Sequence, residues 1–424
     1  MSLNRLWCRL AIPLLWEDPF SISTKNYNFI DIYLHNLKDD DFKTFKTIFY
    51  EYEIKNYLLP SNILFNYPKF IKCLNTSKVI SSVYRWVCET AVKTLKIEFK
   101  AVKNLENLII MTLYRLFIEN KVNLYTLNIV INPYFYNTFF NDFFDLIMQN
   151  QNFIYNIKNL KLQVGETPYI YYSFRDAGFI QKIINLTKPF KLKSLFICKK
   201  SQVKAGLLQS LLQKSGDYLE NFGTSCDYDL LEKQIIDSII IYCKNIKSFA
   251  VFSIYDKTIY STINLIEKRN LNHLSINIDQ FLTGNSLIEG CIKRSSIILQ
   301  NLGQILPSKL EYLNLSLHIK LNDFKIFLKN SQNTFIKKLL IDNKEGDDIL
   351  VILPHIKEHI MKKKRVKYLA ITDTFFGSFA YDIFRYKDLF YLNDEVEEFR
   401  LHNVKVQKYY DLTISITDFI KEVD

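Results

Sequence analysis

"LEYLNL" (Leu310–Leu315) is one of twelve short stretches that share one pattern, with apolar residues at the first, fourth and sixth positions. The others are VKTLKI (Val92–Ile97), LENLII (Leu105–Ile110), LYTLNI (Leu124–Ile129), IKNLKL (Ile157–Leu162), LKSLFI (Leu192–Ile197), LENFGT (Leu219–Thr224), IKSFAV (Ile246–Val251), LNHLSI (Leu271–Ile276), IKKLLI (Ile336–Ile341), VKYLAI (Val366–Ile371) and VEEFRL (Val396–Leu401). Only LENFGT departs from the pattern, with Thr224 at its sixth position. From Ile157 onward the stretches recur about every 30 residues, which indicates an internal repeat.

The segments between these stretches predict helices. GLLQSLLQKSGDY (Gly206–Tyr218), LLEKQIIDSIIIYC (Leu230–Cys243) and LNDFKIFLKNSQ (Leu321–Gln332) carry apolar residues at helical spacing. Each repeat therefore predicts a helix, a loop and a short strand. Parallel strands need a crossover connection of about a dozen residues, and a helix supplies one. We expect an α/β solenoid with parallel strands on its concave face and helices outside.

The period and the L-x-x-L-x-L core resemble those of leucine-rich repeats, although the Asn or Cys that usually follows is missing from nearly all units. The resemblance implies a leucine-rich-repeat-like array, which we expect to span residues 91–424. The pattern is absent before about Val92, and residues 26–90 predict a small helical linker or N-terminal cap.

Composition limits the class of protein. The chain has 424 residues, of which 48% are hydrophobic and 15% aromatic, so it can bury a large core and is not disordered. Only 10 glycines occur, which argues against folds built on Gly-rich phosphate loops. The net charge of +11 is modest for this length, although it is compatible with an acidic partner.

Compartment is predicted from the cysteines and the apolar runs. The seven cysteines form no C-x-x-C pair and predict reduced, mostly buried thiols. No apolar run is long enough for a signal-peptide core or for a membrane span. We therefore expect a cytoplasmic or nuclear protein without a membrane association.

The opening stretch, NRLWCRLAIPLLWEDPF (Asn4–Phe20), predicts one short amphipathic helix. Residues that precede a proline disfavour helical backbone, so the helix should end before Pro13. The stretch resembles the final helix and exit segment of an F-box, in which an Asn-x-x-Trp helix is followed by a proline and a second tryptophan. The matching residues are Asn4, Trp7, Pro13, Trp16 and Phe20.

With its repeats, the chain is similar to the divergent fungal F-box-like families, and residues 1–25 would be the C-terminal remnant of the F-box. The resemblance implies the substrate receptor of a Skp–cullin–F-box ubiquitin ligase. The candidates for adaptor binding are Leu6, Trp7, Leu10, Pro13 and Trp16. The Leu-Pro-containing helices that make most of the adaptor contact in that family are not found before Met1, so a second interpretation stays open, in which this helix only caps the array.

Two columns of strand residues are expected to face the concave surface, because side chains alternate along a strand. Neither column forms a basic stripe, which argues against a groove that follows a phosphate backbone. Small, aromatic and amide side chains suit a protein or peptide partner better. The partner-binding candidates are Phe196, His273, Tyr312, Asn314, Lys338, Tyr368 and Arg400.

Two further motifs fit a functional site but also fit a structural role. HIKEH (His355–His359) fits the H-x-x-E-H form of zinc peptidases, but a match of five residues is weak and solvent-facing helix residues explain it as well. KKKRVK (Lys362–Lys367) fits a nuclear-import or phosphate-binding patch, whereas we favour a helix end that runs into the next strand.

The sequence thus predicts a non-enzymatic recognition protein that needs no cofactor or metal and binds a protein substrate, with a Skp-type adaptor and cullin ligase as further partners. The alternatives are a stand-alone interaction scaffold without a ligase link and a basic protein that associates with nucleic acid. Adaptor binding would separate the ligase receptor from the stand-alone scaffold, and salt-sensitive retention on DNA or RNA would identify the protein that associates with nucleic acid.

Overall fold

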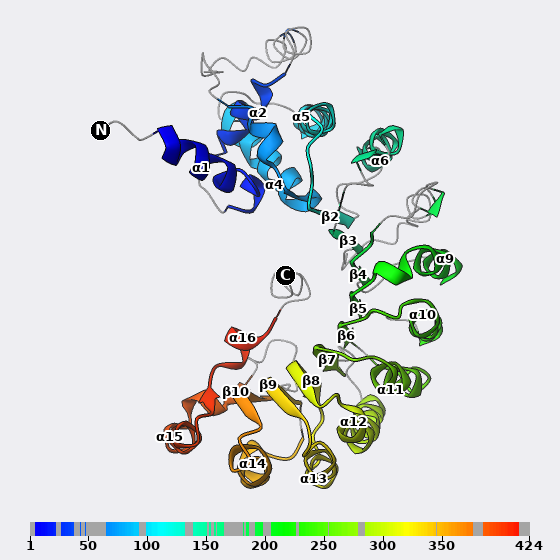
Figure 1. Cartoon of the computed structure of the whole chain (residues 1–424), viewed down its shortest axis with the longest axis vertical. Helices are drawn as coiled ribbons and strands as arrows, with labels where there is room; N and C mark the ends of the chain where they lie inside the picture. Colours follow the sequence, from blue (N-terminus) through cyan, green and yellow to red (C-terminus); the bar gives the residue numbers. More distant parts are fainter. Residues whose placement is uncertain are drawn as a thin grey trace. The chain divides into compact units, whose positions relative to one another are not determined.

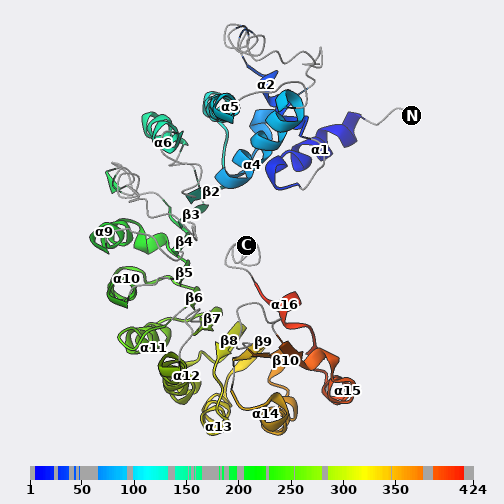
Figure 2. The ribbon, with the colours of Figure 1, turned by 180° about the vertical axis from the view of Figure 1, so that it is seen from behind.

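A computed structural model gives the fold, shown in Figures 1 and 2. It describes residues 5–22, 27–37, 43, 47, 65–92, 99–131, 139–150, 152–153, 157, 159–164, 181, 184–185, 191–197, 205–225, 229–252, 254–278, 285–344, 346–375 and 385–414. The chain divides into two compact units, Met1–Lys193 and Ser194–Asp424. The boundary between them lies inside the array that the sequence predicts from residue 91 onward.

The first unit combines helices with short parallel strands. Its elements are α1 (Arg5–Leu15), η1 (Pro19–Ser21), α2 (Phe29–Leu34), η2 (Tyr67–Phe70), β1 (Cys73–Asn75), α4 (Thr76–Val87), η3 (Cys88–Val92), α5 (Phe99–Glu119), β2 (Thr126–Ile131), α6 (Phe139–Gln149) and β3 (Asn159–Val164). Strand β2 pairs in parallel with β1 and with β3. The strand β1 lies within residues 26–90, which the sequence predicts to be helical. Its segment IKCLNT (71–76) resembles the repeat pattern, but it has Thr76 at the last apolar position, as LENFGT has Thr224.

Aromatic side chains form the core of the first unit. The ring of Trp16 lies 4.3 Å from that of Tyr67 and 5.2 Å from that of Tyr33, measured between centroids. Tyr33 in turn packs against Phe117 of α5, with the ring centroids 5.4 Å apart. Helix α1 runs through Pro13 to Leu15, so the predicted stop before Pro13 is wrong. A proline removes a single backbone donor, and the hydrogen bond from Trp16 N to Ile12 O (3.1 Å) closes the last turn.

The carboxyl group of Asp31 makes the stability of this unit dependent on pH. Asp31 lies in α2, where Trp86 Nε1 donates a hydrogen bond of 3.0 Å to its Oδ1. Burial raises the pKa of Asp31 from 3.8 to about 6. The folded chain thus binds this proton more tightly than the unfolded chain does, and folding stability should decline as pH rises from about 4 to about 6.

Replacing Asp31 with asparagine should therefore stabilise the protein at pH 8 and leave its stability at pH 4 nearly unchanged. Asparagine still accepts the bond from Trp86 but carries no charge to be buried. The expected gain at pH 8 is about 1 kcal/mol, below the full equivalent of the pKa shift because water screens a partly exposed carboxylate. Urea unfolding of both proteins at the two pH values measures it. An Asp31→Asn protein that is less stable than the native chain at pH 8 would contradict this assignment.

The second unit is an α/β structure with a mostly parallel sheet. Its elements are β4 (Ser194–Ile197), α9 (Ala205–Ser215), η5 (Gly216–Tyr218), β5 (Asn221–Ser225), α10 (Asp229–Tyr242), β6 (Ser248–Phe252), α11 (Ile259–Lys268), β7 (His273–Asn277), α12 (Asn285–Ile305), β8 (Lys309–Leu317), α13 (Leu321–Asn330), β9 (Phe335–Lys344), α14 (Ile349–Ile356), η6 (Lys357–Met361), β10 (Val366–Phe375), β11 (Arg385–Asp388), η7 (Leu389–Tyr391), α15 (Asn393–Leu401), β12 (Lys405–Val406) and α16 (Tyr409–Leu412). Strands β4 to β10 pair in parallel in chain order. Strand β10 also pairs with β11, antiparallel, and with β12, parallel.

Helices α9 to α15 of this unit follow one side of its row of strands, and α16 lies on the other side (Figures 1 and 2). The apolar residues of the repeat pattern form the core between them, as in β8, where Leu310, Leu313 and Leu315 are fully buried. The predicted helices in Gly206–Tyr218, Leu230–Cys243 and Leu321–Gln332 are confirmed as α9, α10 and α13. The predicted α/β class is therefore confirmed for the described residues.

Two of the twelve stretches are helical, contrary to the prediction. LENLII lies within α5, and VEEFRL lies within α15. Apolar residues three positions apart share a helix face as well as the pattern of the repeat, so the pattern alone does not separate the two structures. VKTLKI falls almost wholly outside the described residues. The other nine stretches contain or overlap the strands β2 to β10.

Candidate functional site

The two predicted columns of strand residues are aligned in the second unit. The strand register pairs His273 with Tyr312, Tyr312 with Lys338, and Lys338 with Tyr368. The second column is aligned in the same way, in the order Phe196, Gly223, Ala250, Ser275, Asn314, Leu340 and Ala370. We call the sheet face that carries these columns the helix-free face, because α9 to α15 all lie on the opposite face and only the single turn α16 lies on this one in the described residues. Arg400 is not on it: this residue lies on α15, is largely exposed and forms an ion pair with Glu397 one helical turn earlier (2.6 Å).

Most of these candidates are buried, although they were predicted to face a partner. Phe196 and Tyr312 are 2% and 1% exposed, and His273 and Asn314 are 8% and 7% exposed. Lys338 and Tyr368 are half-buried. Around Tyr312 the covering residues come from the chain itself, because Tyr409 and Leu412 of α16 pack with Tyr312, Leu340 and Ala370 in one apolar cluster.

Polar contacts fix α16 on this face. Tyr409 donates from its hydroxyl to Asn314 Oδ1 at 2.9 Å, and the backbone N of Ile414 donates to the Tyr312 hydroxyl at 3.3 Å. The backbone N of Tyr409 donates to Asp388 Oδ2 at 3.1 Å. Burial raises the pKa of Tyr409 well above its ordinary value, with a further contribution from the charge of Asp342, so its hydroxyl remains a donor. The C-terminal segment and the strand residues therefore form one hydrogen-bonded site.

The candidates for adaptor binding divide into two groups. Trp7 and Leu10 are 67% and 57% exposed on α1, whereas Trp16 is half-buried against Tyr33 and Tyr67. Pro13 is half-buried too, and the side chain of Leu6 lies outside the described residues. Leu14, which was not among the candidates, is 68% exposed and falls seven residues after Trp7, on the same helix face.

The HIKEH motif spans the end of α14 and the wide turn η6. The Nδ1 of His359 lies 3.1 Å from the backbone O of His355, so this ring nitrogen is engaged within its own helix. Among the described residues, no group of three or more His, Cys, Asp and Glu side chains has the arrangement of a metal site. His359 therefore contacts the backbone of the preceding turn, and Glu358 is exposed.

The KKKRVK motif is a helix end that runs into a strand, as we favoured. Lys362, Lys363 and Lys364 are exposed in the turn after η6, and Val366 begins β10. Arg365 is buried and donates to the backbone O atoms of Ser331 and Thr334 at the end of α13. Arg269 does the same for α10, with Nε 2.9 Å from Cys243 O and Nη2 2.6 Å from Ile240 O. Arginine side chains of one repeat thereby satisfy the free carbonyl groups of the preceding helix.

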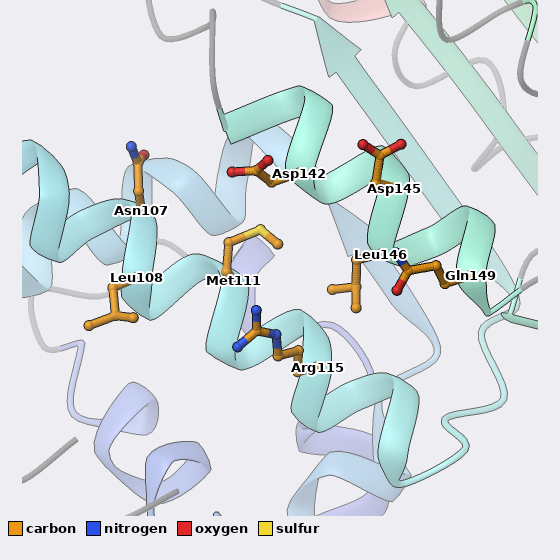
Figure 3. A pocket seen from close by; sticks show the side chains of 8 residues that line it. All are labelled: Asn107, Leu108, Met111, Arg115, Asp142, Asp145, Leu146 and Gln149. Atoms are coloured by element: carbon orange, nitrogen blue, oxygen red, sulfur yellow. The ribbon is translucent and has the colours of Figure 1, made fainter. Parts of the chain in front are cut away.

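A surface pocket in the first unit lies between α5 and α6 and has a volume of about 480 Å³ (Figure 3). Met111 and Arg115 line it from α5, and Asp142 and Asp145 line it from α6. The charged side chains are exposed at its edge. The sequence did not predict this pocket, and its residues do not form an arrangement with a nucleophile and a base.

Comparisons with protein-family models and with curated proteins find no match to this chain. In the described part of the chain, none of the helices combines the length and the apolar character that a bilayer span requires. The functional assignment therefore depends on the arrangement of the chain's own residues.

Proposed function

We propose that this protein is a non-enzymatic recognition protein of the leucine-rich-repeat type, and that it acts as the substrate receptor of a Skp–cullin–F-box ubiquitin ligase. In this proposal α1 docks on a Skp-type adaptor, and the helix-free face of the strands holds the protein to be modified.

The leucine-rich-repeat part of the proposal is supported by a polar link between successive repeats. Asn343, two residues after the last apolar residue of IKKLLI, accepts a hydrogen bond from Ile319 N (3.1 Å) and donates to Asp373 Oδ1 (2.9 Å). Asp373 takes the same place after VKYLAI and accepts a bond from Ile349 N at 2.9 Å. Asn343 and Asp373 thus link the loops of neighbouring repeats from equivalent positions, which supports an array of stacked repeats.

The observation that carries the ligase part is the exposed apolar face of α1. Trp7, Leu10 and Leu14 are each more than half exposed, while Trp16 and Phe20, just after the helix, are packed into the first unit. An apolar helix face of this kind is typical of a docking surface. The F-box-like segment would thus present its helix to an adaptor and fix its exit segment to the rest of the chain.

Replacing Trp7, Leu10 and Leu14 together with alanine should weaken binding to a purified Skp-type adaptor at least tenfold, or by at least about 1.4 kcal/mol. The change removes exposed apolar surface and should leave the folded structure intact. Leu401→Ala is the matched control, because Leu401 is 74% exposed on α15, in the other unit. Biolayer interferometry with immobilised adaptor measures both. Equal adaptor binding by the triple variant and the native chain would place the contact elsewhere.

Absence of adaptor binding by the native chain, and by a version extended upstream of Met1, would eliminate the ligase proposal and leave the stand-alone scaffold. The packing of Trp16 against Tyr33 and Tyr67 favours that second candidate, in which α1 is a terminal cap. Retention on DNA or RNA that falls with salt would instead support association with nucleic acid.

A further inference from the structure

The last described residues of the chain lie on the helix-free face. We call residues 407–414, which follow the edge strand β12, the C-terminal strap. Strand β12 pairs with Tyr368 and Leu369 of β10, and at the start of the strap Gln407 N donates to Leu369 O at 3.0 Å. The following turn, α16, lies on the side of the strands opposite α13 and α14 (Figure 1). Its Tyr409 and Leu412 pack in one apolar cluster with Tyr312 of β8, Leu340 of β9 and Ala370 of β10. The strap thus occupies the surface that a partner was predicted to contact.

The strap contacts this surface as a bound peptide would. Tyr409 and Leu412, three residues apart in one helical turn, are each 7% exposed, whereas Tyr410 between them is 67% exposed. The side chains of Tyr409 and Leu412 therefore point to the sheet. The hydroxyl of the buried Tyr409 ring donates a hydrogen bond to Asn314 Oδ1. The site selects a hydroxyl-bearing ring, because a phenyl ring would leave the buried amide oxygen of Asn314 without this donor.

We propose that the face over β8–β10 is a docking site for segments with the pattern Tyr-x-x-Leu, that the strap fills it in cis, and that a partner binds by displacing the strap. The inference depends on the proposed recognition function and specifies the chemistry of the partner. A segment of the partner would place its tyrosine where Tyr409 lies and its leucine where Leu412 lies.

The strap can leave without opening the core of the second unit. Its backbone bonds to β10 at Gln407, and α16 is a single turn. The buried Val404 and the strand β12 precede the strap and stay in the sheet. The side chains that it covers, Tyr312, Leu340 and Ala370, lie on the helix-free face. Leu313, Leu339 and Leu369 are fully buried in the repeat core on the opposite face. Tyr409 and Leu412 of the strap belong to a different cluster. Segments held by few contacts at a chain end open more easily than the strands beneath them.

The test uses the full chain and a fluorescent peptide with the sequence of residues 407–414. The variant Tyr409→Ala/Leu412→Ala should bind this peptide at least tenfold more tightly than the native chain, whose site is filled. The variant Tyr410→Ala is the matched control and should behave as the native chain does, because Tyr410 points away from the sheet. A peptide in which phenylalanine replaces the first tyrosine should bind several-fold more weakly, since it has no hydroxyl for Asn314.

Hydrogen exchange tests the same proposal on the native chain, without any substitution. The amides of Gln407 and Tyr409 should exchange at least tenfold faster than those of Leu339 and Leu369 in the sheet. Exchange at equal rates, or no peptide binding by a variant with a native circular dichroism spectrum, would overturn the proposal. Peptide binding without adaptor binding would contradict the ligase proposal alone, and adaptor binding without peptide binding would contradict this inference alone.

Discussion

Replacing Asn343 with alanine should lower the free energy of unfolding by about 4 kcal/mol, because it removes several buried hydrogen bonds at once. Asn343 is 2% exposed, and its amide joins Ile319 N, Asp347 O and Asp373 Oδ1 at 3.1, 2.8 and 2.9 Å. Alanine would leave the N–H of Ile319 without its acceptor and Asp373 without one of its donors. Urea denaturation followed by circular dichroism measures the loss.

The charge of Asp373 is the main reason for so large an effect. This carboxyl is fully buried, burial raises its pKa, and the bonds from Ile349 N and Asn343 Nδ2 oppose that rise. Removing the Asn343 donor should raise the pKa of Asp373 further, so the destabilisation should be larger at pH 8 than at pH 5. Asn301→Ala is the control, since Asn301 is exposed on α12 and bonds only to its own helix. A loss below 1 kcal/mol for Asn343→Ala would show that the link between repeats contributes little.

The register of the second unit could be predicted from the sequence, because a repeat forces equivalent residues into equivalent places. Once LNHLSI and LEYLNL are aligned by their apolar residues, His273 falls beside Tyr312 and Ser275 beside Asn314, as the strand pairing has them. The prediction depends on spacing alone and requires no knowledge of how the repeats curve. It also gave the correct side of the sheet for each column, since side chains alternate along a strand.

The wrong secondary-structure predictions arise where the spacing of apolar residues fits both a helix and a strand. VEEFRL fits the repeat pattern, yet its neighbours Asp394 and Glu395 are acidic residues suited to the first turn of a helix, and the segment forms α15. This error placed Arg400 on a strand. The reverse error concerned β1, where Thr76 replaces the last apolar residue and its hydroxyl accepts a hydrogen bond from Val130 N at 2.9 Å. A polar residue can be buried when it has a hydrogen-bond partner, and a pattern of apolar residues does not identify such a residue as part of the core.

The burial of the candidate site could not be predicted, because it depends on a contact between distant parts of the chain. Tyr409 reaches Asn314 over a separation of 95 residues. No repeat pattern links the two, since the strap follows the last strand and belongs to no unit. The only signal in the sequence is a pair of apolar residues, Tyr409 and Leu412, three positions apart after the array has ended.

Replacing Gly303 with alanine should destabilise the second unit by about 2 kcal/mol, because there is no space for a methyl group between α12 and α13. A Cβ atom at Gly303 would lie 2.7 Å from Phe327 O and 3.1 Å from Ser331 N. Both are backbone atoms at the end of α13, so no side-chain rotation relieves the contact and the two helices must separate. Helix propensity favours alanine by about 1 kcal/mol and offsets part of the loss. Thermal unfolding of the variant and the native chain gives the net effect.

Gly206→Ala provides the matched control, with the opposite sign. Gly206 also lies in a helix, α9, but a Cβ atom there would have no neighbour within 4 Å. Alanine should therefore raise the free energy of unfolding through propensity alone, by about 0.5 kcal/mol rather than the full 1 kcal/mol, because Gly206 lies in the first turn of α9. Because both changes add one methyl group to a helix, the difference between them isolates the close approach of α12 and α13. If both variants gained stability, the helices would be free to move apart, and tight packing between successive repeats would not contribute to the stability of this unit.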